Sequence, residues 1–131
     1  MPVVADVTRG EVPRFPADES AGIIAQRLRE SGQDWAAIVD AEGLLLGRVR
    51  LDRIADPSSI AADVMEEGPS TYRPNVPLQE LLSRMEDKGF SKAFVTDPDG
   101  RLVGLIVRED IEAALNRPGI AASLGRSLQE E

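Results

Sequence analysis

Apolar residues follow two alternating spacings along this chain, and the whole pattern occurs twice. Apolar positions three or four residues apart are typical of one buried helix face. In each copy this stripe is followed by two short apolar runs on either side of a polar turn, which is typical of a β-hairpin. The stripes cover 21–28 and 78–85, and the paired runs cover 36–39 with 44–49 and 93–96 with 102–107. The pattern predicts a helix and then a hairpin in each copy.

Polar residues and glycines indicate where these helices begin and end. Asp18 and Asn75 precede the two stripes, and each can cap the first turn of a helix. Gly32 and Gly89 follow the stripes and can adopt the left-handed conformation that ends a helix. We therefore expect two helices of similar length.

The remaining segments have less regular patterns. The turns at 40–43 and 97–100 each begin with aspartate and end with glycine, so turn formation explains their carboxylates without a metal or catalytic role. A last helix is expected from 108, a short lead-in helix over 60–65, and a C-terminal tail over 118–131.

The two copies align without gaps at a spacing of 57 residues. This register pairs Ala5 with Ala62 and Ile54 with Ile111, and it also pairs Gly47 with Gly104. Repetition of this kind indicates one structural unit present twice, with a shared core because neither half is large enough to be stable alone. The expected units are 1–57 and 58–117.

Composition narrows the classes of function. The 131 residues include no cysteine and no histidine, which excludes Ser-His-Asp and Cys-His catalysis and removes the commonest metal ligands. No phosphate-binding glycine loop occurs either, so we expect no enzyme, no metal site and no required cofactor. A net charge of −8 without a dense basic cluster argues against nucleic acid as a partner.

The chain begins with Met and shows neither an export signal nor an apolar stretch of the roughly 20 residues that a membrane helix needs. We expect a complete, soluble, cytoplasmic protein that does not enter a membrane. A piece of a larger transporter or synthase subunit is the alternative.

Four segments carry a resemblance to a known family. They are ADVM at 62–65, TYRP at 71–74, FVTD at 94–97 and GRLVGLIVRED at 100–110. In this order and spacing, and in duplicate, they resemble a CBS domain pair, also called a Bateman module, over about residues 3–117. The resemblance implies an α+β fold of two tandem β-α-β-β-α units related by a pseudo-twofold axis, and a stand-alone pair that forms a homodimer.

The resemblance also implies a ligand site between the units. In the family, a serine or threonine meets phosphate and an aspartate three residues later accepts hydrogen bonds from the ribose hydroxyls. Here Asp110 has the ribose position but Val107 replaces the hydroxyl residue, and in the first copy Arg50 and Arg53 take the two positions. The two clefts are therefore expected to differ. The implied ligand-binding residues are Asp110, Val107, Arg108, Thr71, Tyr72, Pro74, Phe94, Val95, Arg50 and Arg53.

Each of these residues also has a structural interpretation. Asp110 suits the first turn of a helix because of the helix dipole. Arg48 and Arg50 alternate on one strand and either bind phosphate or pair with nearby acids. Tyr72 matches Phe15 and suits a core position, whereas Trp35 has no aromatic counterpart and suits an exposed surface or a partner contact.

The resemblance implies a regulatory sensor that binds an adenosyl ligand, either AMP, ADP, ATP or S-adenosylmethionine. Such a module signals through its dimer to a regulated protein that the sequence does not identify. The alternative is a structural dimerisation or interaction module that has lost nucleotide binding through the changes at Val107, Arg50 and Arg53.

Overall fold

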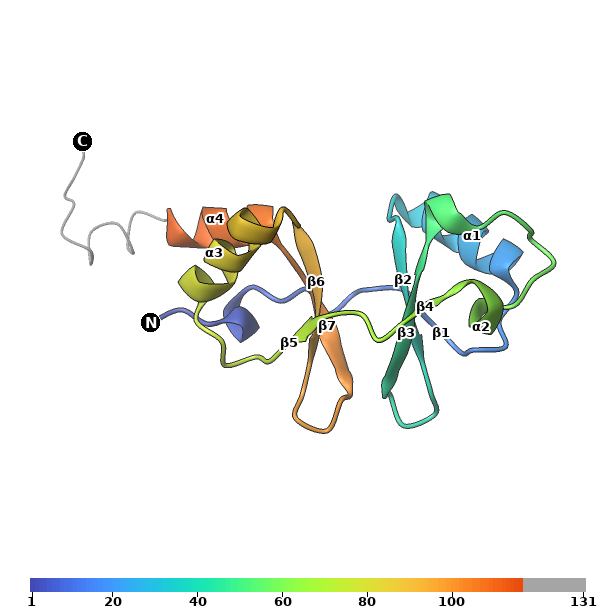
Figure 1. Cartoon of the computed structure of the whole chain (residues 1–131), viewed down its shortest axis with the longest axis horizontal. Coiled ribbons are helices and arrows are strands. Elements are labelled where there is room, and N and C mark those ends of the chain that lie inside the picture. The colour runs from blue at the N-terminus through green and yellow to red at the C-terminus, as the bar shows by residue number, and fades with distance from the viewer. Residues whose placement is uncertain (117–131) are drawn as a thin grey trace.

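The computed structural model describes residues 1–116, which form two units side by side with a sheet in each and helices on their outer sides (Figure 1). Both units contain the predicted helix and hairpin, preceded by a short first strand. The first unit contains β1 (Arg14–Phe15), α1 (Ala21–Ser31), β2 (Trp35–Val39) and β3 (Leu45–Arg50). The second contains β5 (Thr71–Tyr72), α3 (Leu78–Lys88), β6 (Lys92–Thr96) and β7 (Leu102–Val107). The predicted tail at 118–131 lies outside the described residues.

The two units share one strand topology. In each unit the first strand runs parallel to the second, and the second pairs antiparallel with the third. The register is the same too, since Arg14 pairs with Ala37 and the equivalent Thr71 pairs with Phe94. A further short strand, β4 (Glu66–Glu67), adds to the edge of β3 in the first sheet. The mixed α and β fold with two repeated units is confirmed.

The helix expected at the end of each unit forms only in the second. There α4 (Arg108–Leu115) packs beside α3, whereas the first unit has a single 3-10 turn, η2 (Leu51–Arg53). The difference follows from Pro57, which stands at the position of Ala114 in α4. Proline lacks the N–H that a helix needs and disfavours a helical conformation in the residue before it.

The two long helices end as predicted but begin elsewhere. Gly32 and Gly89 follow the helices with positive φ angles of 69° and 75°. Ser20 caps α1 instead of Asp18, because its Oγ accepts a hydrogen bond from the Ile23 N–H at 3.4 Å. The cap position of α3 is Pro77, so the prediction of Asn75 as a cap is also wrong.

The short segment before each unit packs on the other unit. The 3-10 helix η1 (Val4–Asp6) places Val4 in the core of the second unit, and the Val4 N–H donates to the Val76 carbonyl at 2.8 Å. Helix α2 (Ala61–Val64), within the predicted lead-in at 60–65, places Ala61 in the core of the first unit. A division of the chain after residue 57 therefore separates each unit from a segment that completes its core.

Two matched glycines lie where these exchanged segments cross the sheets. A Cβ atom on Gly104 would lie 2.1 Å from the Arg9 carbonyl oxygen. A Cβ atom on Gly47 would lie 2.7 Å from the sulfur of Met65 and 2.8 Å from the Glu66 carbonyl oxygen. Since such contacts are far too short for real atoms, both positions need glycine so that the backbones can approach.

A third apolar cluster joins the two units through the facing sides of their sheets. It consists of Val12, Ala37, Phe94 and Leu102, with Trp35 packed against it. The rings of Trp35 and Phe94 lie 5.5 Å apart in a tilted arrangement. Trp35, which we expected on an exposed surface or at a partner contact, thus contributes to the contact between the units.

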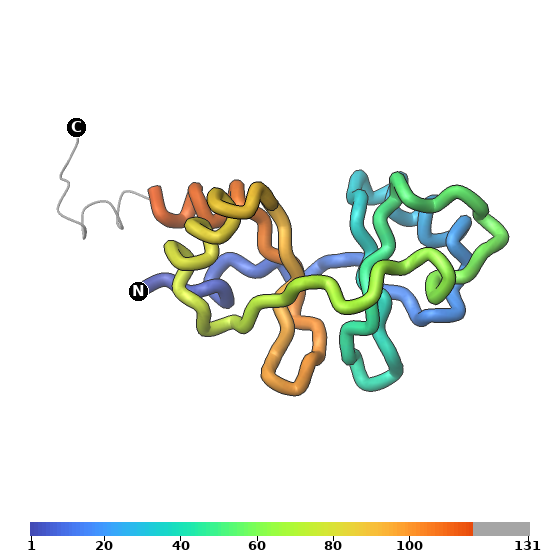
Figure 2. Tube along the Cα trace, in the orientation of Figure 1, coloured from blue at the N-terminus to red at the C-terminus, as the bar shows by residue number. Residues whose placement is uncertain are grey.

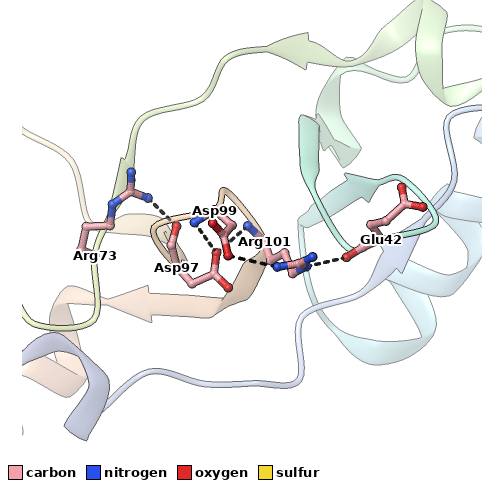
Figure 3. Close-up of polar contacts among 5 residues, drawn as sticks. All are labelled: Glu42, Arg73, Asp97, Asp99 and Arg101. Atoms are coloured by element: carbon pink, nitrogen blue, oxygen red, sulfur yellow. Dashed lines mark hydrogen bonds and ion pairs between the residues drawn. The ribbon is translucent and has the colours of Figure 1, made fainter.

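The two hairpins lie side by side (Figure 2), and their tips bind each other (Figure 3). The Leu45 N–H donates to the Gly100 carbonyl at 3.1 Å, and the Leu102 N–H donates to the Gly43 carbonyl at 2.9 Å. The guanidinium of Arg101 donates to the Glu42 carbonyl at 3.1 Å and reaches from the second unit to the first (Figure 3). The hairpins therefore fix the angle between the units.

Turn formation accounts for the aspartates at these tips. Oδ1 of Asp97 accepts the Asp99 and Arg101 N–H groups at 2.9 Å, and Asp40 does the same in the first turn. Arg73 donates to the Thr96 hydroxyl at 3.0 Å and to the Asp97 carbonyl at 2.6 Å (Figure 3). The predicted structural role of the turn carboxylates is confirmed.

No helix within residues 1–116 is long and apolar enough to cross a membrane. Over the same residues, acidic side chains do not gather in a group of three that could hold a metal ion.

Candidate functional site

A cleft of about 720 Å³ lies between the two units. The first unit contributes Trp35, Arg48 and Arg50, and the second contributes side chains from β5, from the end of α3 and from β6. Its aromatic residues are Trp35, Tyr72, Phe90 and Phe94, and its basic residues are Arg48, Arg50, Arg84, Lys88 and Lys92. No carboxylate is among the described residues that line it. We call this space the cationic cleft.

Local structure explains why the basic residues meet there. Arg48 and Arg50 are two apart on β3, so both side chains project from the same side of the strand. Arg84 and Lys88 are four apart on α3 and share one helix face. Lys92 begins β6 directly after this helix and its closing turn. Secondary structure thus brings together cations that are scattered over more than forty residues of sequence.

Glu66 on β4 balances two of these cations. Its carboxylate accepts hydrogen bonds from Arg48 Nε at 2.9 Å and from Arg50 Nη2 at 3.2 Å, and it lies 2.7 Å from Arg48 Nη2. Burial alone would raise the pKa of Glu66, but the hydrogen bond from Arg48 and the charges of Arg48, Arg50 and Arg53 hold that pKa below its ordinary value. Glu66 is therefore ionised at neutral pH.

One donor in the cationic cleft has no acceptor. Nε of Arg50 is buried and makes no hydrogen bond, the one such side-chain atom found within residues 1–116. An unsatisfied donor on a charged group is costly, because burial has removed the water that would otherwise bind it. Because the atom is buried, a ligand in the cleft would reach it only after the Arg50 side chain moves.

Trp35 is flanked by two of the cations. The guanidinium of Arg48 lies 4.4 Å from the centre of its ring, and the ammonium of Lys92 lies 4.6 Å from it. Both distances are within the range of cation–π attraction. Lys92 also pairs with Asp34 on the other side. The indole thereby helps to hold the basic side chains in place.

A second cleft of about 190 Å³ occupies the equivalent position on the other side of the pair. Leu105 and Val107 line it at the positions that Arg48 and Arg50 take in the cationic cleft. Arg9 also lines it, and the Arg9 guanidinium binds both carboxylate oxygens of Asp110, at 2.6 and 2.9 Å. The hydrogen bond to Asp110 and the charge of that carboxylate raise the pKa of Arg9.

The predicted ligand residues are divided between several places. Arg50, Tyr72 and Phe94 line the cationic cleft. Val107 lines the smaller cleft, and Asp110 lies beside it in the ion pair with Arg9. The structure therefore separates Asp110 from the arginines that we expected to receive the phosphates of the same ligand.

The other predicted residues lie outside the lining of both clefts. Arg108 pairs with Glu86 and Glu112, and Val95 is fully buried in the core of the second unit. Thr71 and Arg53 are exposed, and Pro74 is half-buried with its carbonyl accepting the Ala5 N–H at 2.9 Å.

Sequence analysis missed Arg84, Lys88 and Lys92 as candidates for the site. The spacing of Arg84 and Lys88 on one helix face was the signal that could have suggested a pair of cations. Nothing in the sequence placed that face opposite β3 of the other unit, because this contact depends on how the units pack.

Comparison with known proteins identifies the second unit directly. Residues 61–117 match the CBS domain family. Among curated proteins, an uncharacterised protein of Methanopyrus kandleri is 26% identical over 117 residues, which cover 82% of this chain and 60% of that protein. The chain also covers 23% of a homoserine O-acetyltransferase of Methanohalobium evestigatum, at 31% identity. It thus spans less than two thirds of these relatives.

Solved structures show the same fold over nearly the whole chain. The CBS domain pair of protein MJ0100, in complex with 5-methylthioadenosine and S-adenosyl-L-methionine, has a TM-score of 0.73 at 21% identity and covers 88% of this chain and 96% of its own. CBSX2 in complex with AMP has a TM-score of 0.74 at 19% identity, and the match covers 95% of this chain and 98% of the CBSX2 chain. The second unit therefore belongs to the CBS domain family, and the chain as described is folded as a CBS domain pair.

Proposed function

We propose that this chain is a regulatory sensor that binds an adenine nucleotide in the cationic cleft. The observation that carries the proposal is the lining of this cleft, where aromatic residues meet five basic side chains that outnumber the two carboxylates paired with them, those of Glu66 and Asp34. A volume of about 720 Å³ lies within the range of small-molecule sites. An adenine ring can stack on the aromatic side chains while the phosphates bind the cations.

Electrostatics selects among the adenosyl ligands. AMP, ADP and ATP are anions, whereas S-adenosylmethionine carries a positive sulfonium and a positive amino group beside one carboxylate. After pairing with Glu66 and Asp34, the five cations still leave an excess of positive charge in the partly enclosed cleft, which attracts the former and repels the latter, although the chain as a whole has a net charge of −8. We therefore place the nucleotides ahead of S-adenosylmethionine.

The known complexes support an adenosyl ligand. MJ0100 was solved with two adenosyl compounds and CBSX2 with AMP, in chains of the same fold. Because the sequence identities of those proteins to this chain are low, we infer the ligand of this chain from the lining of its own cleft.

The proposed role is non-catalytic and needs no cofactor beyond the ligand itself. The chain has no histidine or cysteine to act as a base or nucleophile near neutral pH. A sensor needs instead two arrangements with different affinities for the ligand. We propose that these two arrangements differ in how the two chains of a homodimer pack against each other. An unidentified regulated protein would detect the change from one arrangement to the other.

One observation favours the alternative of a structural module for part of the chain. The Arg9 ion pair occupies both oxygens of Asp110, the family's ribose carboxylate, and Val107 offers no hydroxyl. We therefore expect the smaller cleft to bind nucleotides more weakly than the cationic cleft, and one ligand to bind per chain.

Calorimetric titration of AMP, ADP, ATP and S-adenosylmethionine tests the proposal. We expect one site per chain, tighter binding as the number of phosphates increases, and a loss of about tenfold or more in Arg50→Ala. Arg29→Ala, which removes an exposed arginine of α1 outside the lining, is the matched control and should change affinity less than twofold. Absence of heat with all four ligands would leave only the structural module.

A further inference from the structure

Glu66 occupies the place that a phosphate of the proposed ligand would need. Its two carboxylate oxygens bind Arg48 and Arg50, which both line the cationic cleft. The Glu66 side chain is 39% exposed while those of Arg48 and Arg50 are 22% and 28% exposed. The carboxylate therefore lies at the edge of the cleft, within reach of solvent, while the guanidiniums extend inward.

The repeat shows that this arrangement is not a requirement of the fold. The counterpart of Glu66 in the register of the two copies is Arg9, and the counterparts of Arg48 and Arg50 are Leu105 and Val107. Arg9 makes the same backbone contact with its sheet, since its N–H donates to the Leu105 carbonyl at 2.8 Å. The backbone position is thus filled equally well by a residue of opposite charge.

We propose that Glu66 is an internal competitor for the phosphates of the nucleotide and sets the charge selectivity of the cationic cleft. The inference rests on the proposed function. The carboxylate supplies one negative charge and acceptors for three guanidinium nitrogens, as a phosphate group would. A ligand with one phosphate gains little by replacing it. A ligand with two or three phosphates can displace the carboxylate and still reach Arg84 and Lys88.

Displacement of Glu66 would act directly on the connection between the units. Glu66 lies in β4, whose two residues pair with β3, and the chain then crosses to the second unit through 68–70, as Figure 2 shows. Pro69 and Ser70 in this crossing also line the cationic cleft. Release of the carboxylate therefore loosens a short strand whose continuation touches the same ligand.

Glu66→Gln tests the inference, because it keeps the shape of the side chain and removes its charge. Glu67→Gln, the exposed neighbour on the same strand, is the control for net charge. Affinities for ATP and AMP are measured by calorimetry and by the fluorescence of Trp35, the single tryptophan, which lines the cleft. We expect Glu66→Gln to bind ATP about tenfold more tightly, with a smaller gain for AMP, since removal of one nearby charge favours the ligand with more charges.

The outcomes separate the inference from the proposed function. If wild type binds nucleotide and the two variants show equal affinities, Glu66 does not compete and the inference is overturned. If Glu66→Gln binds more weakly than Glu67→Gln, the carboxylate positions the arginines for the ligand, which also overturns it. If neither wild type nor Glu66→Gln binds any nucleotide while both unfold cooperatively, the proposed function fails. Binding by Glu66→Gln alone would support both.

Discussion

Replacement of Gly104 by alanine should detach the N-terminal segment from the second unit. The new Cβ would lie 2.1 Å from the Arg9 carbonyl oxygen and 2.9 Å from the Arg9 carbonyl carbon. Because both contacts are with backbone atoms, no side-chain rotation can relieve them. The segment around Arg9 must move away from β7 by about 1 Å to restore an ordinary van der Waals separation.

The cost of this movement can be worked from the contacts that it breaks. Two hydrogen bonds of 2.8 Å join Arg9 and Leu105, and each contributes about 1 kcal/mol. The ion pair between Arg9 and Asp110 is largely exposed on the arginine side and contributes about 0–1 kcal/mol. Strain in the fully buried Val4, if the segment stays attached, is of the order of 1–3 kcal/mol. We expect the free energy of unfolding to fall by about 3–6 kcal/mol.

Urea unfolding followed by circular dichroism and by Trp35 fluorescence measures this change. Gly10→Ala is the matched control, because no atom lies within 4 Å of its added Cβ, and it should stay within about 0.5 kcal/mol of wild type. The stability of Gly47→Ala should lie between those of Gly104→Ala and Gly10→Ala, since the closest contact of its added Cβ is the movable sulfur of Met65. A Gly104→Ala protein as stable as Gly10→Ala would refute the close approach of the two segments.

Three further predictions concern the core, the ion pair and pH. Phe94→Ala should cost about 3–5 kcal/mol in urea unfolding, because the ring is fully buried between the two sheets, and a loss below 1 kcal/mol would contradict that packing. Asp110→Ala should cost less than about 1 kcal/mol and leave ATP affinity within twofold, since the carboxylate lies outside the cationic cleft; a large loss of affinity would return Asp110 to the site. The lowered pKa of Glu66 means that its stabilising effect is present above its ordinary value of 4.5 and is lost as the pH falls further, through its folded-state value. Wild type should therefore lose stability more steeply than Glu66→Gln in acid, and parallel pH profiles would count against the ion pair.

The sequence predicted the helices and strands better than it predicted which of them pack together. Periodicity located the two long helices and both hairpins, and the glycines at 32 and 89 marked the helix ends. These features depend on a few neighbouring residues, so the local pattern contains them. The cap at Asp18 was wrong because Ser20 stands nearer the start of α1, and the cap at Asn75 was wrong because α3 begins after Pro77 without a side-chain cap.

The exchange of the lead-in segments could not be predicted from periodicity. Val4 and Ala61 are apolar residues in short segments, and nothing in their own spacing shows which unit they complete. The matched Gly47 and Gly104 were the available signal, since a conserved absence of Cβ in both copies indicates that another backbone passes there. The cationic cleft was missed for the same reason, because its lining comes from both units.

The difference between the two clefts follows from their side chains, since the strand pairing beside them is equivalent. In the first unit, a carboxylate on the edge strand meets two arginines, and in the second an arginine on the edge segment meets Asp110. The first arrangement leaves an excess of cations in a cleft of about 720 Å³, whereas the second is balanced beside a cleft of about 190 Å³. On the proposed function, one copy of the unit has a polyanion site and the other has none, although Glu66 and its counterpart Arg9 occupy equivalent backbone positions beside their sheets.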